Sequence, residues 1–460
     1  NSKGLLSVKG EQANNITNSA ESYATSAQQI HAKCLVHFRP KRGWKGEDYG
    51  FDWMRVGDTG VFGDTDYKTI VAKQYKKGTF DLIRGIENKN EYKGDFITDE
   101  DLYLELGNDV YGAYEVPWRM TTDPTGNSEV AKYYCSWLSM YPIKKVGESE
   151  QPNSVQVLLK IDIEEAPYEL RFKVPEGFVV SPEVIHTQDK PKGIFEVPLT
   201  ITCNTACESD QELKVMAIAN EGVPIEQGLL AGKLRIWANA PAKQKKAKII
   251  LIKVTTPPIS RGRKGTGETA GQEELFKKFL QQALIDTEVI TKEVDVSIPT
   301  EASYFLRAYT KSGLIRSHYK ERSDIPVGFK DIENYIYDKL KADLSAKGED
   351  PNQYDNAYKA IYFGENGGGQ NNRGTIDKVE GYNAGKFIVL FQEKDKSTAT
   401  HEFLHAFNLP HSFTNREVDD HAKSTYKVQM TENIMDYSHL VPEERYSLWK
   451  WQWEVANGSI

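Results

Sequence analysis

The segment 401–411 carries residue types at a spacing that could bind a metal ion and hydrolyse a bond. In HEFLH, His401 and His405 are four residues apart, so on an α-helix both imidazoles leave the same face, one turn apart. Histidine nitrogens bind Zn²⁺ at about 2.0–2.1 Å in tetrahedral sites. Glu402 follows His401, where we expect it to serve as a general base for a water on the metal and not as a ligand. The motif therefore predicts a hydrolytic zinc site.

A third histidine, His411, stands six residues beyond the second. A continuing helix would carry it about 9 Å further along the axis, out of reach of the same ion. Asn408 and Pro410 provide a stop, because Asn tolerates the left-handed conformation at a helix C-terminus and Pro cannot continue the helix. We therefore predict that the chain turns back at Asn408 and that His411 is the third ligand.

These residues resemble a known family. HEFLHAFNLPH (401–411) is similar to the HExxHxxGxxH zinc signature of the metzincin metallopeptidases, and ENIMDYS (432–438) is similar to their Met-turn. The resemblance implies a zinc peptidase with the following residue roles: His401, His405 and His411 as zinc ligands, Glu402 as general base and acid, and Met435 as the Met-turn residue beneath the metal.

Two further positions are placed by the same resemblance. Tyr437 stands where astacin-like and serralysin-like members carry a switchable tyrosine, which implies that it ligates zinc or stabilises the oxyanion. The MDYS string also resembles pappalysin-like members. Asn408 replaces the usual glycine of the signature, and because Asn tolerates a positive φ we expect the turn to survive.

The resemblance also implies a catalytic fold and a reaction. It implies a twisted, mainly parallel sheet with two long helices, an edge strand that pairs with extended substrate, and a largely irregular part after His411. Glu402 would activate a water on zinc for attack on a protein or peptide bond. The implied function is therefore that of a zinc-dependent endopeptidase.

The surrounding patterns predict the elements that position this site. Residues 386–392 form a short apolar strand directly before the HExxH segment, which has no Pro or Gly from Ser397 to Leu409. Residues 248–256 and 288–298 suggest further strands, and apolar residues at helical spacing predict helices over 273–285 and 331–346. We predict an α/β catalytic domain over 247–460.

The first half of the chain predicts two all-β modules. Residues 1–30 are rich in Ser, Asn, Ala and Gln and form a polar lead-in segment. Short strand patterns separated by Gly and Asp clusters predict an all-β module over 31–147. Regular alternation of apolar and polar residues predicts an immunoglobulin-like β-sandwich over 148–242. We thus expect a multidomain chain, β-rich first and α/β last.

Composition limits the partners. The chain has 58 basic and 66 acidic residues and a formal net charge of −8, which argues against nucleic acid and favours a protein or peptide partner. No apolar run is long enough to span a membrane. The four cysteines, Cys34, Cys135, Cys203 and Cys207, allow two disulfides but fit reduced thiols almost as well. Because the chain starts with Asn1 and not Met, we expect it to be truncated or processed, and a cleaved secretion signal could have preceded it. We expect an exported protein, secreted or at the cell surface, of bacterial origin.

Two other interpretations stay open. Residues 38–58, FRPKRGWKGEDYGFDWMRVGD, resemble the leading regions of bacterial effectors loaded onto contractile, type VI-like injection systems. That resemblance implies a delivered toxin, or a binding or adhesion scaffold with a secretion-apparatus or surface partner, in which the peptidase domain is secondary or inactive. The acidic tract 417–420 could bind a structural Ca²⁺, although a solvated turn explains it too.

Overall fold

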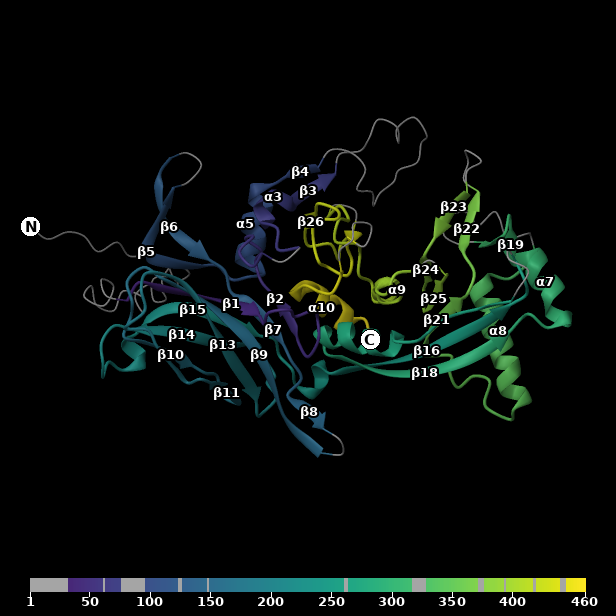
Figure 1. The fold of residues 1–460 in the computed structure, drawn as a ribbon, viewed down its shortest axis with the longest axis horizontal. Helices are drawn as coiled ribbons and strands as arrows, with labels where there is room; N and C mark the ends of the chain where they lie inside the picture. Colours follow the sequence, from purple (N-terminus) through teal and green to yellow (C-terminus); the bar gives the residue numbers. More distant parts are fainter. Residues whose placement is uncertain are drawn as a thin grey trace, which may run out of the picture. The chain divides into compact units, whose positions relative to one another are not determined.

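The computed structural model of the 460-residue chain is β-rich, with several separate sheets (Figure 1). The chain forms two compact units: the first comprises residues 1–45, 49–54 and 104–242, and the second comprises 46–48, 55–103 and 243–460. The structure describes these residues: 32–60, 63–75, 96–122, 126–146, 149–259, 264–316, 328–370, 376–392, 394–416, 419–438 and 444–460. The predicted lead-in segment 1–30 lies outside this part.

One sheet of the first unit is built on the long strand β9. Its order is β1-β9-β13-β11, and β8 also pairs with β9. Strands β1 and β13 are both antiparallel to β9. Alternate residues of β9 from Val155 to Ile163 are buried, as the alternation in the sequence predicts. The strands are β1 (Cys34–Pro40), β8 (Ile143–Val146), β9 (Ser149–Ile163), β11 (Phe178–Ser181) and β13 (Gly193–Cys203).

The second sheet of this unit has the order β12-β10-β14-β15-β7-β2. Gly232 in β15 lies against Val36 of β1, and a Cβ at that glycine would meet the Val36 carbonyl oxygen at 2.2 Å, so only glycine fits. The strands are β2 (Gly50–Asp52), β7 (Ser136–Ser139), β10 (Glu169–Lys173), β12 (Val184–His186), β14 (Gln211–Ile218) and β15 (Leu229–Ile236). Four shorter elements are α5 (Glu100–Asp109), the hairpin β5 (Tyr114–Thr122) and β6 (Ser128–Tyr133), and the 3₁₀ turn η1 (Ile225–Gln227).

The two predicted β modules are interleaved in the structure. Strand β1, from the predicted module 31–147, pairs with β9 from the predicted module 148–242 over its full length. Strand β7 likewise pairs in parallel with β15. Residues 55–103, also expected in the first module, belong to the second unit, and α5 is a helix in a range predicted to be all-β. Alternation identifies strands and their faces but not their partners, so this arrangement was not readable from the sequence.

All four cysteines are free and buried. Burial raises the pKa of the Cys135 thiol to about 11. Cys203 and Cys207 meet at one side chain, Asn239, whose Nδ2 lies 3.6 Å from the Cys203 Sγ and whose Oδ1 accepts from the Cys207 Sγ at 3.3 Å. The reduced alternative is therefore the one that the structure contains.

The main sheet of the second unit is largely parallel. Strands β18, β16, β21 and β25 run parallel in that order, and β24 and β17 add antiparallel edges (Figure 1). The near-continuous apolar run of β16 is buried from Ile249 to Ile252, as expected for a central parallel strand. The strands are β16 (Lys245–Thr256), β17 (Gly265–Thr266), β18 (Ile285–Asp295), β21 (Tyr358–Phe363), β24 (Gly381–Ala384) and β25 (Phe387–Leu390).

Helices pack onto this sheet. The prediction of a helix over 331–346 is confirmed by α8 (Ile332–Ala346), whose buried residues join the core formed with β16 and β21. The helix predicted over 273–285 is shorter: α6 (Gln272–Leu280) passes into the 3₁₀ turn η3 (Gln281–Ala283), and Leu284 takes a φ of 55° before β18 begins. Helix α7 (Pro299–Tyr309) has no counterpart among the predicted elements. Helix α9 (Thr398–Ala406) follows β25, as predicted.

Residues from the early part of the chain complete the second unit. Strand β3 (Val71–Tyr75) pairs with β4 (Phe96–Thr98) and with β26 (Thr425–Tyr426), in a three-stranded sheet. The other elements of the unit are α3 (Tyr67–Ile70), η2 (Pro241–Lys243), β19 (Thr310–Lys311), β20 (Leu314–Arg316), β22 (Gly367–Gln370), β23 (Ile376–Val379) and α10 (Lys450–Gly458). The sheet β26-β3-β4 joins residues more than 300 positions apart.

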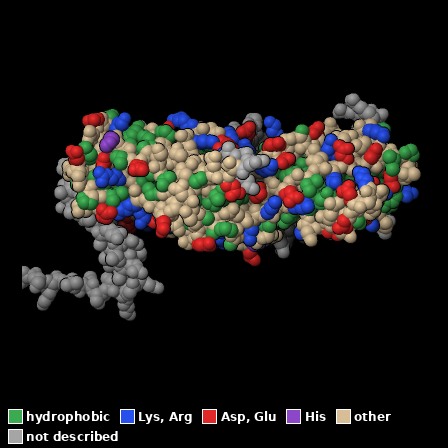
Figure 2. Space-filling view, turned by 90° about the horizontal axis from the view of Figure 1, so that it is seen from below, with side chains coloured by type: hydrophobic (Ala, Val, Ile, Leu, Met, Phe, Trp, Pro, Cys, Tyr) green, Lys and Arg blue, Asp and Glu red, His purple; other side chains and the backbone are tan. Residues whose placement is uncertain are grey.

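Two further features concern the charged side chains on one face of the molecule and the length and apolar character of its helices. On the face drawn in Figure 2, basic and acidic side chains are interspersed. Among the described residues, no helix combines the length and the apolar character needed to cross a bilayer.

Candidate metal centre

Helix α9, which carries the HExxH motif, begins at a side-chain cap. The Asp395 Oδ1 accepts from the backbone N of Ser397 at 2.6 Å and from that of Thr398 at 2.8 Å. These bonds satisfy donors that the first turn of a helix leaves free, and the carboxylate charge is favourable at a helix N-terminus. The cap fixes the start of the helix that carries the motif. In the first turn, the backbone N of His401 donates to the Ser397 carbonyl at 2.9 Å.

The helix ends where the sequence predicts. Asn408 takes the left-handed conformation with a φ of 61°. The backbone N of Leu409 donates to the Leu404 carbonyl at 3.1 Å, and that of Asn408 donates to the His405 carbonyl at 3.1 Å, so the last turn closes on itself. The chain then reverses toward His411. The prediction of a turn at Asn408 is confirmed.

The left-handed conformation of Asn408 should make the stability of the protein sensitive to substitution at this position. Asn408→Ala should lower the free energy of unfolding by about 1 kcal/mol, because a Cβ without a compensating side-chain polar group is strained in the left-handed region. Asn408→Gly relieves that strain but loses the exposed bond from Asn408 Nδ2 to Ser459 Oγ at 3.2 Å, so its net change should be smaller. Urea unfolding of both variants in a metal chelator measures the difference, and equal stabilities would contradict the strain argument.

The three predicted histidines converge on one point. The Nε2 of His411 lies 3.3 Å from the Nε2 of His401 and 3.1 Å from that of His405. Three nitrogens of a tetrahedral ion bonded at about 2.0–2.1 Å lie about 3.3 Å from one another. Among the described residues, the ligand atoms of these three histidines all lie within 4.8 Å of one another. This cluster could hold a metal ion.

The protonation states of the rings fit that role. The Nδ1 of His401 lies 2.8 Å from the Ile434 carbonyl oxygen, and the Nδ1 of His405 lies 2.7 Å from that of Leu409. A carbonyl only accepts, so each Nδ1 carries the proton and each Nε2 presents a lone pair to the shared point. Two of the three nitrogens at the shared point, those of His401 and His405, therefore offer lone pairs that a metal ion bound there would accept.

Burial keeps the three imidazoles neutral. It lowers the pKa of His405 to about 4, and it lowers the pKa of His401 and of His411 well below the usual value. The guanidinium of Arg445 and the neighbouring histidines add to the shift at His401. Neutral imidazole is the form that binds a metal.

The segment around Met435 connects the first and third histidines. Met435 is fully buried, and its carbonyl accepts from the backbone N of Ser412 at 3.0 Å, next to His411. The Asn433 Oδ1 accepts from the Met435 backbone N at 2.9 Å, and Asn433 also pairs with Gln452 of α10. The preceding carbonyl, that of Ile434, orients His401. The predicted Met-turn residue thus lies in the turn that supports two of the three histidines.

Tyr437 lies beside the histidines, as the sequence predicts. Its ring centroid is 4.8 Å from that of His411 and 5.9 Å from that of His401. The ring of Phe413 stacks nearly parallel on the His411 imidazole, with the two centroids 4.7 Å apart. The Phe413 centroid also lies 4.8 Å from that of Tyr437. The sequence analysis did not single out Phe413, which is buried and holds one face of the third histidine.

Glu402 lies one position after His401 on α9 and is partly buried. Burial raises its pKa to about 7, the nearby Arg445 charge opposes that shift, and Glu380 adds to it. A carboxyl of this kind exchanges protons near neutral pH.

The acidic tract 417–420, a candidate calcium site, is only partly described. In the acidic tract, Glu417 and Val418 lie outside the described residues, and the Asp419 Oδ1 accepts from the backbone N of His421 at 2.8 Å. A calcium ion there stays a prediction.

Besides Phe413, two residues of the site were missed. Arg445 is buried and approaches the Nδ1 of His401 to 3.3 Å. No spacing rule relates it to the HExxH motif. Asp395 was detectable, because an Asp shortly before a helical segment signals a cap.

The chain was also compared with known proteins. No protein-family model matches it, and no curated protein matches it significantly.

Proposed function

We propose that this protein is a zinc-dependent endopeptidase. The observation that carries the proposal is the convergence of the three Nε2 atoms of His401, His405 and His411, with two of the opposite nitrogens bonded to backbone carbonyls. Three neutral imidazoles on one side of an ion are a typical catalytic zinc site, which leaves a fourth position for water or substrate. The resemblance of 401–411 and 432–438 to the metzincin signature supports the same assignment.

The residues of the chain have distinct parts in the proposed reaction. Zinc, when bound, supplies Lewis-acid chemistry that makes a water more acidic and polarises the substrate carbonyl. Glu402 takes the proton of the attacking water and returns it to the leaving amine. Tyr437, beside His411, donates a hydrogen bond to the oxyanion. Atoms balance, because the water supplies a hydroxyl to the new acid and a proton to the amine.

The second unit supports a metzincin-like architecture for the catalytic domain. Four parallel strands with the antiparallel strand β24 at one edge, the long helix α8 and the active helix α9 correspond to the expected plan. The described residues after Ala406 contain only β26 and α10 as regular elements, as expected for the lower part. The two sheets of the first unit support an immunoglobulin-like sandwich, to which β1, β2 and β7 contribute.

Metal content and proteolysis test the proposal together. The purified full chain should contain one zinc per molecule and cleave casein, and a chelator should abolish cleavage until zinc is restored. His411→Ala should lose most of the zinc, because one of three protein ligands is removed. A chain that holds no zinc, or that cleaves equally well in the chelator, would contradict the proposal.

The alternative interpretation stays a prediction. Zinc binding without cleavage of any protein substrate would favour a delivered effector or a binding scaffold, with the first unit as its functional part. Export and bacterial origin are likewise predictions, since four buried free thiols suit either compartment.

A further inference from the structure

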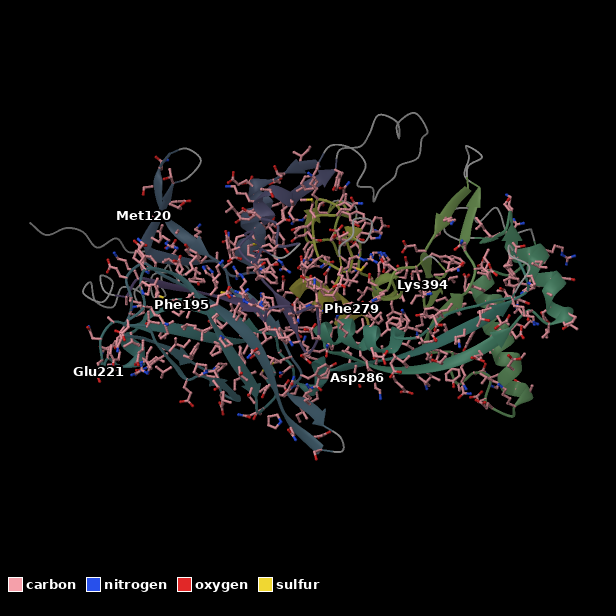
Figure 3. All side chains as sticks on the ribbon, viewed as in Figure 1. Met120, Phe195, Glu221, Phe279, Asp286 and Lys394 are labelled. Atoms are coloured by element: carbon pink, nitrogen blue, oxygen red, sulfur yellow. The ribbon has the colours of Figure 1, made fainter. Side chains whose placement is uncertain are left out.

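Arg445 is a buried arginine that contacts the start of helix α9, the turn around Met435 and one of the three histidines. Its side chain is only 1% exposed. Its Nε donates to the Ser397 Oγ at 2.9 Å, its Nη2 pairs with the Asp395 Oδ2 at 2.8 Å, and its Nη1 donates to the Asp436 carbonyl at 3.0 Å. Lys394, labelled in Figure 3, directly precedes Asp395 in the segment between β25 and α9.

Each of these contacts reaches a segment that positions a metal ligand. Asp395 and Ser397 form the start of α9, which carries two of the histidines. Asp436 follows Met435 in the turn. In that turn the Ile434 carbonyl accepts from His401, and the Met435 carbonyl accepts from the backbone N of Ser412, next to His411. One guanidinium therefore fixes the helix and the Met435 turn relative to each other.

The fourth contact is with a ligand itself. The Nη1 of Arg445 lies 3.3 Å from the Nδ1 of His401. That Nδ1 already gives its proton to the Ile434 carbonyl at 2.8 Å, so the arginine does not replace this bond. It lies at the Nδ1 edge of the ring, whereas the Nε2 of the same ring faces the other two histidines.

We propose that Arg445 is a positioning residue for the metal centre, setting the place of the His401 Nε2 relative to the other two histidines. This inference rests on the proposed metal site. An arginine suits the task because its planar fork can bond three partners in fixed directions, whereas a lysine ammonium cannot reproduce that arrangement. Groups that orient ligands from behind typically change metal affinity by about 10–100-fold when they are removed.

Two variants of the full chain test the inference without relying on activity. Arg445→Lys keeps the charge and removes the fork. Asp395→Asn keeps an oxygen for the helix start and replaces the oxygen that faces Arg445, and because Asp395 is 29% exposed this change should be tolerated by the fold. Zinc dissociation constants are measured by competition with a chromogenic chelator, well below the melting temperature of each variant.

A matched control separates positioning from general stability. Arg119 is an arginine of the first unit, and its Nη1 donates to the Tyr133 Oη and the Asp162 Oδ2, each at 2.9 Å. Arg119→Lys makes the same substitution outside the unit that holds the histidines, and it should leave the zinc affinity within about twofold of the unchanged protein.

We expect Arg445→Lys to weaken zinc binding by about 10-fold or more, and Asp395→Asn to weaken it less but in the same direction. If both variants bind zinc as tightly as the unchanged protein, or if Arg119→Lys loses affinity equally, Arg445 has only a structural part and the inference is overturned. If the unchanged protein binds no zinc, the proposed function fails as well, so the two failures are distinguishable.

Discussion

Glu402→Gln should abolish peptide hydrolysis while the protein keeps its zinc. The amide has nearly the same shape as the carboxyl but cannot take a proton from water, so we expect a loss of about 10²–10⁴-fold in kcat. Zinc content should not change, because the three convergent Nε2 atoms belong to His401, His405 and His411. Cleavage of a fluorogenic peptide, with elemental analysis of the same sample, measures both quantities.

His405→Ala is the control that separates binding from chemistry. It removes a ligand and should lose zinc and activity together, whereas Glu402→Gln should lose activity alone. A Glu402→Gln protein that contains zinc and retains more than about a tenth of the activity would remove Glu402 from the proposed mechanism.

A chain that begins at Lys243 should neither fold cooperatively nor bind zinc tightly. Such a chain keeps all three histidines and Glu402, yet it lacks residues 55–75, which belong to the same unit. The catalytic domain predicted from the sequence, 247–460, leaves these early residues out, whereas the structure includes them in the unit that carries the histidines.

The missing residues support the segment that connects the third histidine to Met435. Strand β3 pairs with β26, and the side chain of Tyr75 accepts from the Val428 backbone N at 2.7 Å. The Tyr75 backbone N donates to the Asn415 Oδ1 at 2.7 Å. Arg55 forms a buried ion pair with Glu432, and removing one member of such a pair costs about 3–5 kcal/mol.

A pair of substitutions tests the same point in the full chain. Tyr67 is fully buried, with its ring 5.0 Å from that of Tyr426 and 6.1 Å from that of Trp449. Tyr67→Ala should lower the free energy of unfolding of the second unit by about 3–5 kcal/mol, and Tyr67→Phe by less than about 1.5 kcal/mol. Chemical unfolding followed by tryptophan fluorescence measures both. A stable, zinc-binding 243–460 fragment would contradict the expected dependence.

The metal cluster could be predicted because its geometry is local. Two histidines lie four positions apart on one helix, and Asn408 with Pro410 ends that helix, so spacing alone places three imidazoles together. The strands β16 and β25 and the helix α8 were found for a similar reason, since each is long or strongly apolar.

The remainder depends on contacts between distant residues. Strand β1 shows clear alternation, but nothing in it identifies β9 as its partner. Arg445 reads as an ordinary charged residue in a polar segment, and only the folded chain buries it against Asp395 and Ser397. The end of α6 was misjudged because Leu284 adopts a left-handed conformation that a leucine rarely takes.

The discontinuity of the second unit has a consequence for biosynthesis. Tyr75 and its partner Val428 are 353 residues apart. At about 5–20 residues per second, a ribosome needs roughly 20–70 s between making one and the other. During that interval the early strand has no native neighbour from the late part of the chain, whereas the first unit can already assemble. The histidines and the turn that holds them, residues 401–438, are made after every residue of the first unit. A newly made chain therefore cannot form its metal centre until long after the early strand has been made, and any proteolytic activity is delayed by the same interval.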